Sequence, residues 1–202
     1  MLNGCSRAGL VAAVFLCCFA CCLLGGCGIG HSGGEARLQS LQGEGELRLS
    51  LPTRVYAPRD ADTVDIYMTD LPESVWNAGA DVSDMAGTLV HVRMFIRPKS
   101  GRTPIADTAS TATLRCMVLA RGEIGVYGGG GFFVDGADAG DKVFEGSVRN
   151  ATLRLVSATG GFNDRLGACV FSGGVSGRLD EETAERMERA MRALIGETQR
   201  VE

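Results

Sequence analysis

The feature that most constrains the fold of this chain is an alternation of apolar and polar residues, which runs from Glu44 towards the C-terminus. In residues 89–97, one set of alternate positions holds Val90, Val92, Met94 and Ile96, and the other holds His91, Arg93, Phe95 and Arg97. Successive side chains of a strand point to opposite faces of a sheet, so this pattern predicts a half-buried strand.

The same pattern predicts further strands along the chain. It recurs in residues 47–51, 64–69, 111–120, 143–156 and 167–175. Segment 143–156 is either one long strand or two strands interrupted near Arg149. Proline and glycine punctuate the chain between these runs, as expected of turns. Strands at this spacing, without regularly interposed helices, predict a mainly β fold: an antiparallel β-sandwich or a partly open barrel.

Two segments have helical signals instead. Residues 180–196 begin with three acidic residues, and their apolar side chains recur at helical spacing, at Ala184, Met187, Met191, Leu194 and Ile195. We expect one C-terminal amphipathic helix, which either packs on the sheet or binds another protein of the cell envelope. A much shorter helix is expected after Asp70, with this aspartate as its N-cap and Trp76 in the core.

The N-terminus is apolar and without charge from Ala8 to Leu24, directly after Arg7, and ends in Leu24-Gly25-Gly26-Cys27. This arrangement resembles the lipobox of bacterial lipoproteins. The resemblance implies lipidation of Cys27, removal of residues 1–26 and anchoring in a membrane through the N-terminal lipid. Since residue 28 is glycine and not aspartate, it also implies the outer membrane, facing the periplasm. The alternatives are an ordinary signal peptide and an uncleaved membrane helix, for which the run is short.

The expected organisation is therefore a cleaved signal peptide (1–26), a flexible tether (27–45) rich in glycine and polar residues, and a single β-rich domain (46–202). The whole chain has a net charge of −4. Its negative balance and the absence of a basic run argue against nucleic acid as a partner.

Cys116 and Cys169 are the other two cysteines that remain once the leader is removed. Both fall on the apolar sides of their predicted strands, so they are either a disulfide in an oxidising compartment or two separate buried thiols. No paired cysteine or histidine spacing indicates a metal site, and we expect no cofactor.

Two other features of the sequence could have a functional role. His91 is interpreted as an exposed histidine on the polar side of its strand. The glycine-rich segment 125–131 lacks the spacing of a phosphate-binding loop. It is interpreted as a hairpin connection or bulge, or as a flexible loop that presents its flanking aromatic residues.

Without a catalytic constellation, the sequence favours a non-enzymatic function: a membrane-anchored envelope lipoprotein that acts as a binding or scaffolding module. The alternative is a carrier of lipid or another small apolar ligand in a curved sheet. A hydrolase using scattered acids such as Asp65, Asp70 or Glu145 is the least favoured hypothesis.

Overall fold

The computed structural model describes residues 36–60, 63–77, 79–95, 111–135 and 140–201. The strands are β1 (Ala36–Ser40), β2 (Glu46–Leu49), β3 (Thr53–Pro58), β4 (Thr63–Thr69), β5 (Ala86–Phe95), β6 (Ala112–Ala120), β7 (Glu123–Asp135), β8 (Val143–Ala158), β9 (Cys169–Leu179) and β10 (Gln199–Arg200). A single turn of 3-10 helix, η1 (Glu73–Trp76), follows β4, and the helix α2 (Glu181–Gly196) follows β9. The prediction of a mainly β fold with one C-terminal helix is confirmed.

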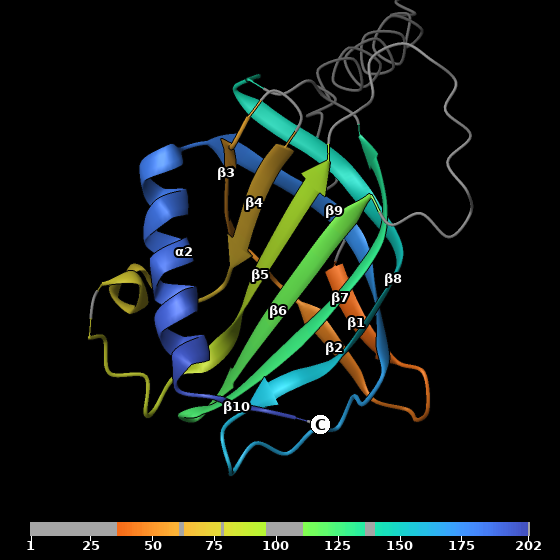
Figure 1. Ribbon diagram of the computed structural model, residues 1–202, viewed down its shortest axis with the longest axis vertical. Coiled ribbons are helices and arrows are strands. Elements are labelled where there is room, and N and C mark those ends of the chain that lie inside the picture. Colours follow the sequence, from red (N-terminus) through yellow and green to blue (C-terminus); the bar gives the residue numbers. More distant parts are fainter. Residues whose placement is uncertain (1–35, 61–62, 78, 96–110, 136–139, 202) are drawn as a thin grey trace, which may run out of the picture. The chain divides into compact units, whose positions relative to one another are not determined.

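The strands form one strongly curled sheet in the order β10-β8-β7-β6-β5-β4-β3-β9-β1-β2 (Figure 1). Strand β8 pairs with β7 along one edge and with β9 along the other. Strands β3 to β9 therefore close into a ring, and β1, β2 and β10 extend it. All pairings are antiparallel except that between β3 and β9. The closed ring is nearer to the expected barrel than to the sandwich.

The alternation of residues builds two separate cores. Side chains that point into the ring form the larger core, which includes the fully buried Tyr56, Tyr127, Phe144 and Phe171. Side chains on the outer face of β3 to β7 form a second core with the apolar stripe of α2. The stripe contains Met187, Met191 and Leu194, as expected for a helix that packs on the sheet. None of the described helices is long and apolar enough to cross a membrane.

The folded domain begins earlier than expected. The sequence predicts that residues 36–45 belong to the tether, but β1 pairs with both β2 and β9, and Ala36 and Leu38 are buried. The strand is short and glycine follows it closely, so its alternation did not stand out. The boundary at residue 46 is therefore wrong, and β1 belongs to the domain. Cys27 lies outside the described residues.

The glycine-rich segment 125–131 is neither a loop nor a hairpin connection, because it forms the interior of β7. Close backbone approach explains part of its composition: a Cβ atom on Gly129 would lie 1.9 Å from the carbonyl oxygen of Thr152 on β8. The pairing of β7 with β8 also shifts register twice, so the expected bulge is present within the strand.

The two helical predictions had different outcomes. Helix α2 begins after Asp180, whose carboxylate accepts a hydrogen bond from the Thr183 N–H at 3.0 Å. Asp70, by contrast, does not cap η1. Its carboxylate accepts a hydrogen bond from the backbone N–H of Thr88 and so links the end of β4 to β5. Trp76 is buried beneath α2, as expected.

Candidate functional site

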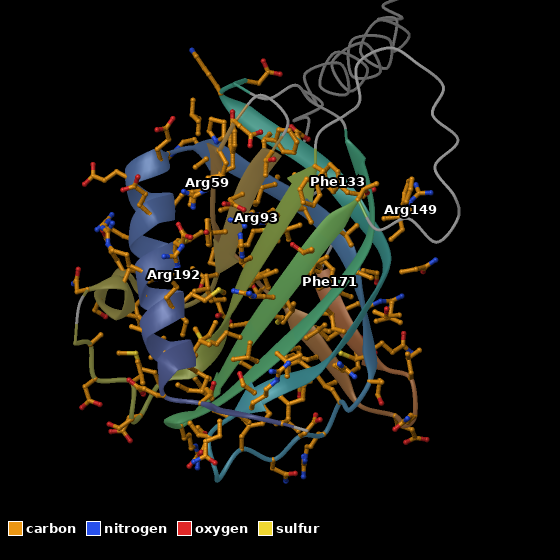
Figure 2. The ribbon with its side chains drawn as sticks, in the orientation of Figure 1. Arg59, Arg93, Phe133, Arg149, Phe171 and Arg192 are labelled. Carbon is orange, nitrogen blue, oxygen red and sulfur yellow. The ribbon has the colours of Figure 1, made fainter. Side chains whose placement is uncertain are left out.

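A groove of about 640 Å³ lies between α2 and the outer face of the sheet. We call it the arginine groove. Its charged and hydrogen-bonding side chains are Tyr67, His91, Arg93, Thr113, Arg115, Arg154, Glu188 and Arg192, and its apolar side chains are Val156, Met191 and Ile195. This volume is in the range of sites for small molecules. Figure 2 shows Arg59 and Arg93 between α2 and the strands, with Arg192 on the helix.

Strand register fixes the floor of the groove. Tyr67, His91, Arg115, Gly128 and Arg154 are consecutive cross-strand partners from β4 to β8, so they form one row on the same face. Neighbouring strands are about 4.8 Å apart, which places the Cα atoms of the two arginines about 10 Å apart. Between them Gly128 contributes no side chain, and Val156 packs beside it. A Cβ atom there would lie 3.3 Å from Val156.

A buried carboxylate supports one end of this row. Asp65 on β4 is fully buried and accepts hydrogen bonds from Arg93 at 2.8 and 3.0 Å and from Arg59. The Nε2 atom of His91 lies 2.9 Å from the same carboxylate. Burial by itself would raise the pKa of Asp65, but the hydrogen bonds from His91, Arg93 and Arg59 outweigh it and hold this pKa far below its usual range. Asp65 is therefore ionised at neutral pH.

Glu188 on α2 is the second carboxylate of the site. It pairs with Arg59 and with Arg192. Burial opposes ionisation here too, yet the hydrogen bond from Arg59 and the nearby guanidinium charges lower the pKa of Glu188. The bridge from Asp65 through Arg59 to Glu188 fastens the helix to the sheet along one side of the groove.

Positive charge in the groove exceeds what these carboxylates neutralise. Arg115 and Arg154 are exposed, and no carboxylate of the described residues pairs with either of them. Together with Arg59, Arg93 and Arg192, they give five guanidinium groups against the two carboxylates of Asp65 and Glu188, an excess of three positive charges. The excess is concentrated here although the whole chain has a net charge of −4. A groove of this kind attracts anions.

Aromatic side chains fill the inner end of the groove. The ring of Tyr67 stacks on that of His91, with centroids 4.6 Å apart and an interplanar angle of 7°. Burial and the charge of Asp65 raise the pKa of Tyr67 to about 12, so its hydroxyl keeps its proton. This buried hydroxyl makes no hydrogen bond of ordinary geometry. His91 is thus not the exposed residue expected from its strand position.

The structure places the sequence-predicted residues as follows. Cys116 and Cys169 are both buried in the core inside the ring, each as a free thiol. Burial raises the pKa of both thiols, that of Cys169 to about 11. Both side chains point to the face of the sheet opposite the groove, so neither contacts a ligand bound there.

The acids considered for a hydrolase are not brought together. Asp65 is held by arginines, Asp70 by the backbone of Thr88, and Glu145 is exposed on β8 opposite Ser176. In the part of the chain that the structure describes, no group of three or more histidine, cysteine or acidic side chains is arranged to hold a metal ion.

Only part of the groove could be predicted from the sequence. His91, Arg93 and Arg115 were visible as outward-facing residues of their strands, but nothing in the sequence indicated that α2 covers this face or that Arg154 joins the same row. Comparison with known proteins adds no further assignment, because no family model, no curated protein and no solved structure matches the chain.

Proposed function

We propose that this chain is a lipid-anchored protein of the bacterial cell envelope that acts by binding a small, negatively charged ligand in the arginine groove. The observation that carries the proposal is the pair Arg115 and Arg154, exposed in a groove of ligand size without a carboxylate partner among the described residues. Guanidinium groups without protein partners are suited to bind carboxylate or phosphate oxygens.

Binding is favoured over catalysis by the state of the acids. Asp65 and Glu188 both have lowered pKa values because arginines hydrogen-bond to them. A general acid must carry a proton near neutral pH, and these two groups do not. Their contacts instead fix the arginines and the helix, which preorganises the groove.

One contact favours a second candidate function. The hydrogen bond between His91 and Asp65 is the arrangement that orients a general base in hydrolases. Two features weigh against it: the Asp65 carboxylate is already neutralised by two guanidinium groups, and the hydroxyl of Thr113 in the groove makes no hydrogen bond with His91. Loss of a hydrolytic activity in a His91→Ala variant with unchanged ligand binding would favour this candidate.

The alternative of an apolar-ligand carrier requires space inside the ring. Four aromatic side chains there, Tyr56, Tyr127, Phe144 and Phe171, are each fully buried in the core. The groove, with its charged floor, offers a different ligand chemistry. We therefore prefer an anionic ligand to a purely apolar one.

The anchor is proposed from the resemblance of residues 24–27 to a lipobox. Eight residues separate Cys27 from Ala36, where β1 begins. Fully extended, this stretch spans at most about 30 Å. A lipid on Cys27 would therefore keep the domain close to the bilayer surface and place the groove within reach of envelope components.

Two experiments test the proposal separately. Mass spectrometry and membrane fractionation of the full chain and of a Cys27→Ser variant test the anchor: retention of the variant in the membrane, with identical processing, would contradict lipidation. Native mass spectrometry of the purified full chain tests the groove. An anion should co-purify with the protein and be lost from an Arg115→Gln, Arg154→Gln double variant but not from Arg149→Gln.

A further inference from the structure

We propose that the arginine groove binds a phosphate monoester, with its phosphate group between Arg115 and Arg154 and an apolar body against Val156 and Ile195. This inference rests on the proposed function and specifies the ligand of the same site. It follows from three properties of the groove: the spacing of the two arginines, their charge, and the apolar residues beside them.

The spacing suits a single tetrahedral anion. Arg115 and Arg154 stand on either side of Gly128 in one cross-strand row. With Cα atoms about 10 Å apart, two arginine side chains can bring their guanidinium groups to opposite sides of one phosphate. Gly128 places no side chain between them, and its backbone lines the groove with Val156 beside it. A planar carboxylate offers only two oxygens and cannot engage two guanidinium forks fully.

The charge also matches. Asp65 and Glu188 are occupied by Arg59, Arg93 and Arg192, so the charges without a described partner in the groove are those of Arg115 and Arg154. A phosphate monoester carries about −1.5 to −2 charges at pH 7, since its second pKa is about 6. It would neutralise both arginines, whereas a carboxylate or a sulfate ester would leave one of them without a counter-charge.

The apolar body is inferred from the wall of the groove. Val156 and Ile195 are half-buried and line it from β8 and α2. A separate, smaller hollow of about 290 Å³ shares Arg154 and Val156 with the groove and is also lined by the exposed Val201. An apolar group placed there would gain from removal of this surface from water. Inorganic phosphate, which lacks such a group, should bind more weakly.

The test is calorimetric titration of the full chain in a non-ionic detergent with four soluble probes: phenyl phosphate, phenyl sulfate, benzoate and inorganic phosphate. Phenyl phosphate should bind at least about tenfold more tightly than phenyl sulfate, which has the same shape but one charge less. Its affinity should increase between pH 5 and pH 7 as the phosphate loses its second proton, and should decrease with added salt.

Variants locate the binding. Arg115→Gln and Arg154→Gln should each weaken phenyl phosphate binding by about tenfold or more, and Gly128→Val should abolish it by filling the space between the arginines. Arg149→Gln is the matched control, because Arg149 is an exposed arginine of the same strand outside the groove (Figure 2). Circular dichroism confirms that each variant is folded.

The outcomes separate this inference from the proposed function. Equal binding of phenyl phosphate, phenyl sulfate and benzoate, all weakened by the arginine substitutions, would overturn the phosphate assignment and leave an anion-binding groove. Binding that is unaffected by Arg115→Gln and Arg154→Gln, or no binding of any probe, would overturn both. Adding phosphatidic acid to the micelles identifies the source of the phosphate: competition with phenyl phosphate indicates a lipid headgroup, and its absence indicates a soluble ester.

Discussion

The ion-pair cluster around Asp65 should make a large contribution to stability, and an Asp65→Asn substitution measures it. This substitution keeps the shape of the side chain but removes the charge that Arg59 and Arg93 share. Removing one partner of a buried ion pair typically costs about 3–5 kcal/mol. In the folded protein the side chains of Arg59 and Arg93 are 32% and 41% exposed, so water can solvate them when the ion pair is broken.

The expected loss is therefore smaller than for a fully buried pair. Arg59 also keeps Glu188 as a partner, and the new amide still accepts a hydrogen bond. We expect the free energy of unfolding to fall by about 2–3 kcal/mol at pH 7. Urea unfolding of the full chain in non-ionic detergent measures it through the fluorescence of Trp76, the single tryptophan, which lies buried in the layer beneath α2.

The pH dependence gives a sharper criterion. The pKa of Asp65 is lowered in the folded state, so its contribution is complete above the pKa of the unfolded chain and is lost as the pH falls below that value. With an unfolded pKa of about 3.9, the difference between the wild type and Asp65→Asn should be constant above about pH 5. It should shrink by about 1.4 kcal/mol for each pH unit below about pH 4.

Asp84→Asn is the control, because Asp84 is exposed and no ion pair of the described residues involves it. It should change stability by less than about 0.5 kcal/mol at any pH. A loss below about 1 kcal/mol for Asp65→Asn at pH 7 would refute the reasoning. So would a difference at pH 2.5 as large as the one at pH 7.

Three further predictions concern the ring itself. Leu38→Ala should destabilise the protein by about 2–5 kcal/mol, because this side chain is buried in the core. Leu41→Ala should destabilise it by less than about 0.5 kcal/mol, because that side chain is 58% exposed. Equal effects of the two substitutions in urea unfolding would show that β1 belongs to the tether and not to the folded domain. Gly129→Ala should destabilise by about 3 kcal/mol or prevent folding, since the methyl group would lie 1.9 Å from a carbonyl oxygen of β8; an unchanged unfolding midpoint would contradict that close approach. The sequence leaves a disulfide and two separate thiols as alternatives for Cys116 and Cys169, and the structure has both as free thiols; the unfolded, processed chain should therefore show two reactive thiols from this pair before reduction, whereas none before reduction and two after it would show a disulfide.

The positions of side chains within each strand could be read from the sequence, but their surroundings could not. Val90, Val92 and Met94 were expected on one face of their strand, and they are buried inside the ring. Asp65 and Tyr67 were expected on the polar face of theirs, and they do point outward, yet both are fully buried. The alternation of a strand reports the direction of a side chain and not what another element places over it. Here α2, far along the chain, covers the outward face.

Closure of the sheet into a ring also could not be predicted from the sequence. The pattern left a sandwich and a partly open barrel as alternatives, because both present one apolar face per strand. The difference lies in one strand, β8, which pairs along both of its edges. Its 16 residues are long enough to reach past β7 and curl onto β9. Glycines in β7 allow the close backbone approach that such curvature requires, and their number was the sequence signal for it.

The arginine groove depends on a single inserted residue. Phe144 and Val148 on β8 point into the ring, and so do Ala151 and Leu153, although the first two numbers are even and the last two odd. The change of parity comes from a bulge in which the pairing of β8 with β9 shifts register between Val148 and Ala151, where Asn150 has a φ angle of +51°.

Without this bulge, strict alternation would turn Arg154 into the ring and leave Arg115 without its neighbour across Gly128. Asparagine adopts a positive φ angle more readily than most residues, so Asn150 can maintain the bulge without a glycine at this position. The interruption near Arg149 was detectable in the sequence as a break in the alternation. Its consequence for Arg154 was not, because one extra residue reverses the face of the side chains that follow it up to the next register shift, and only the register of the strands shows that the reversal occurs.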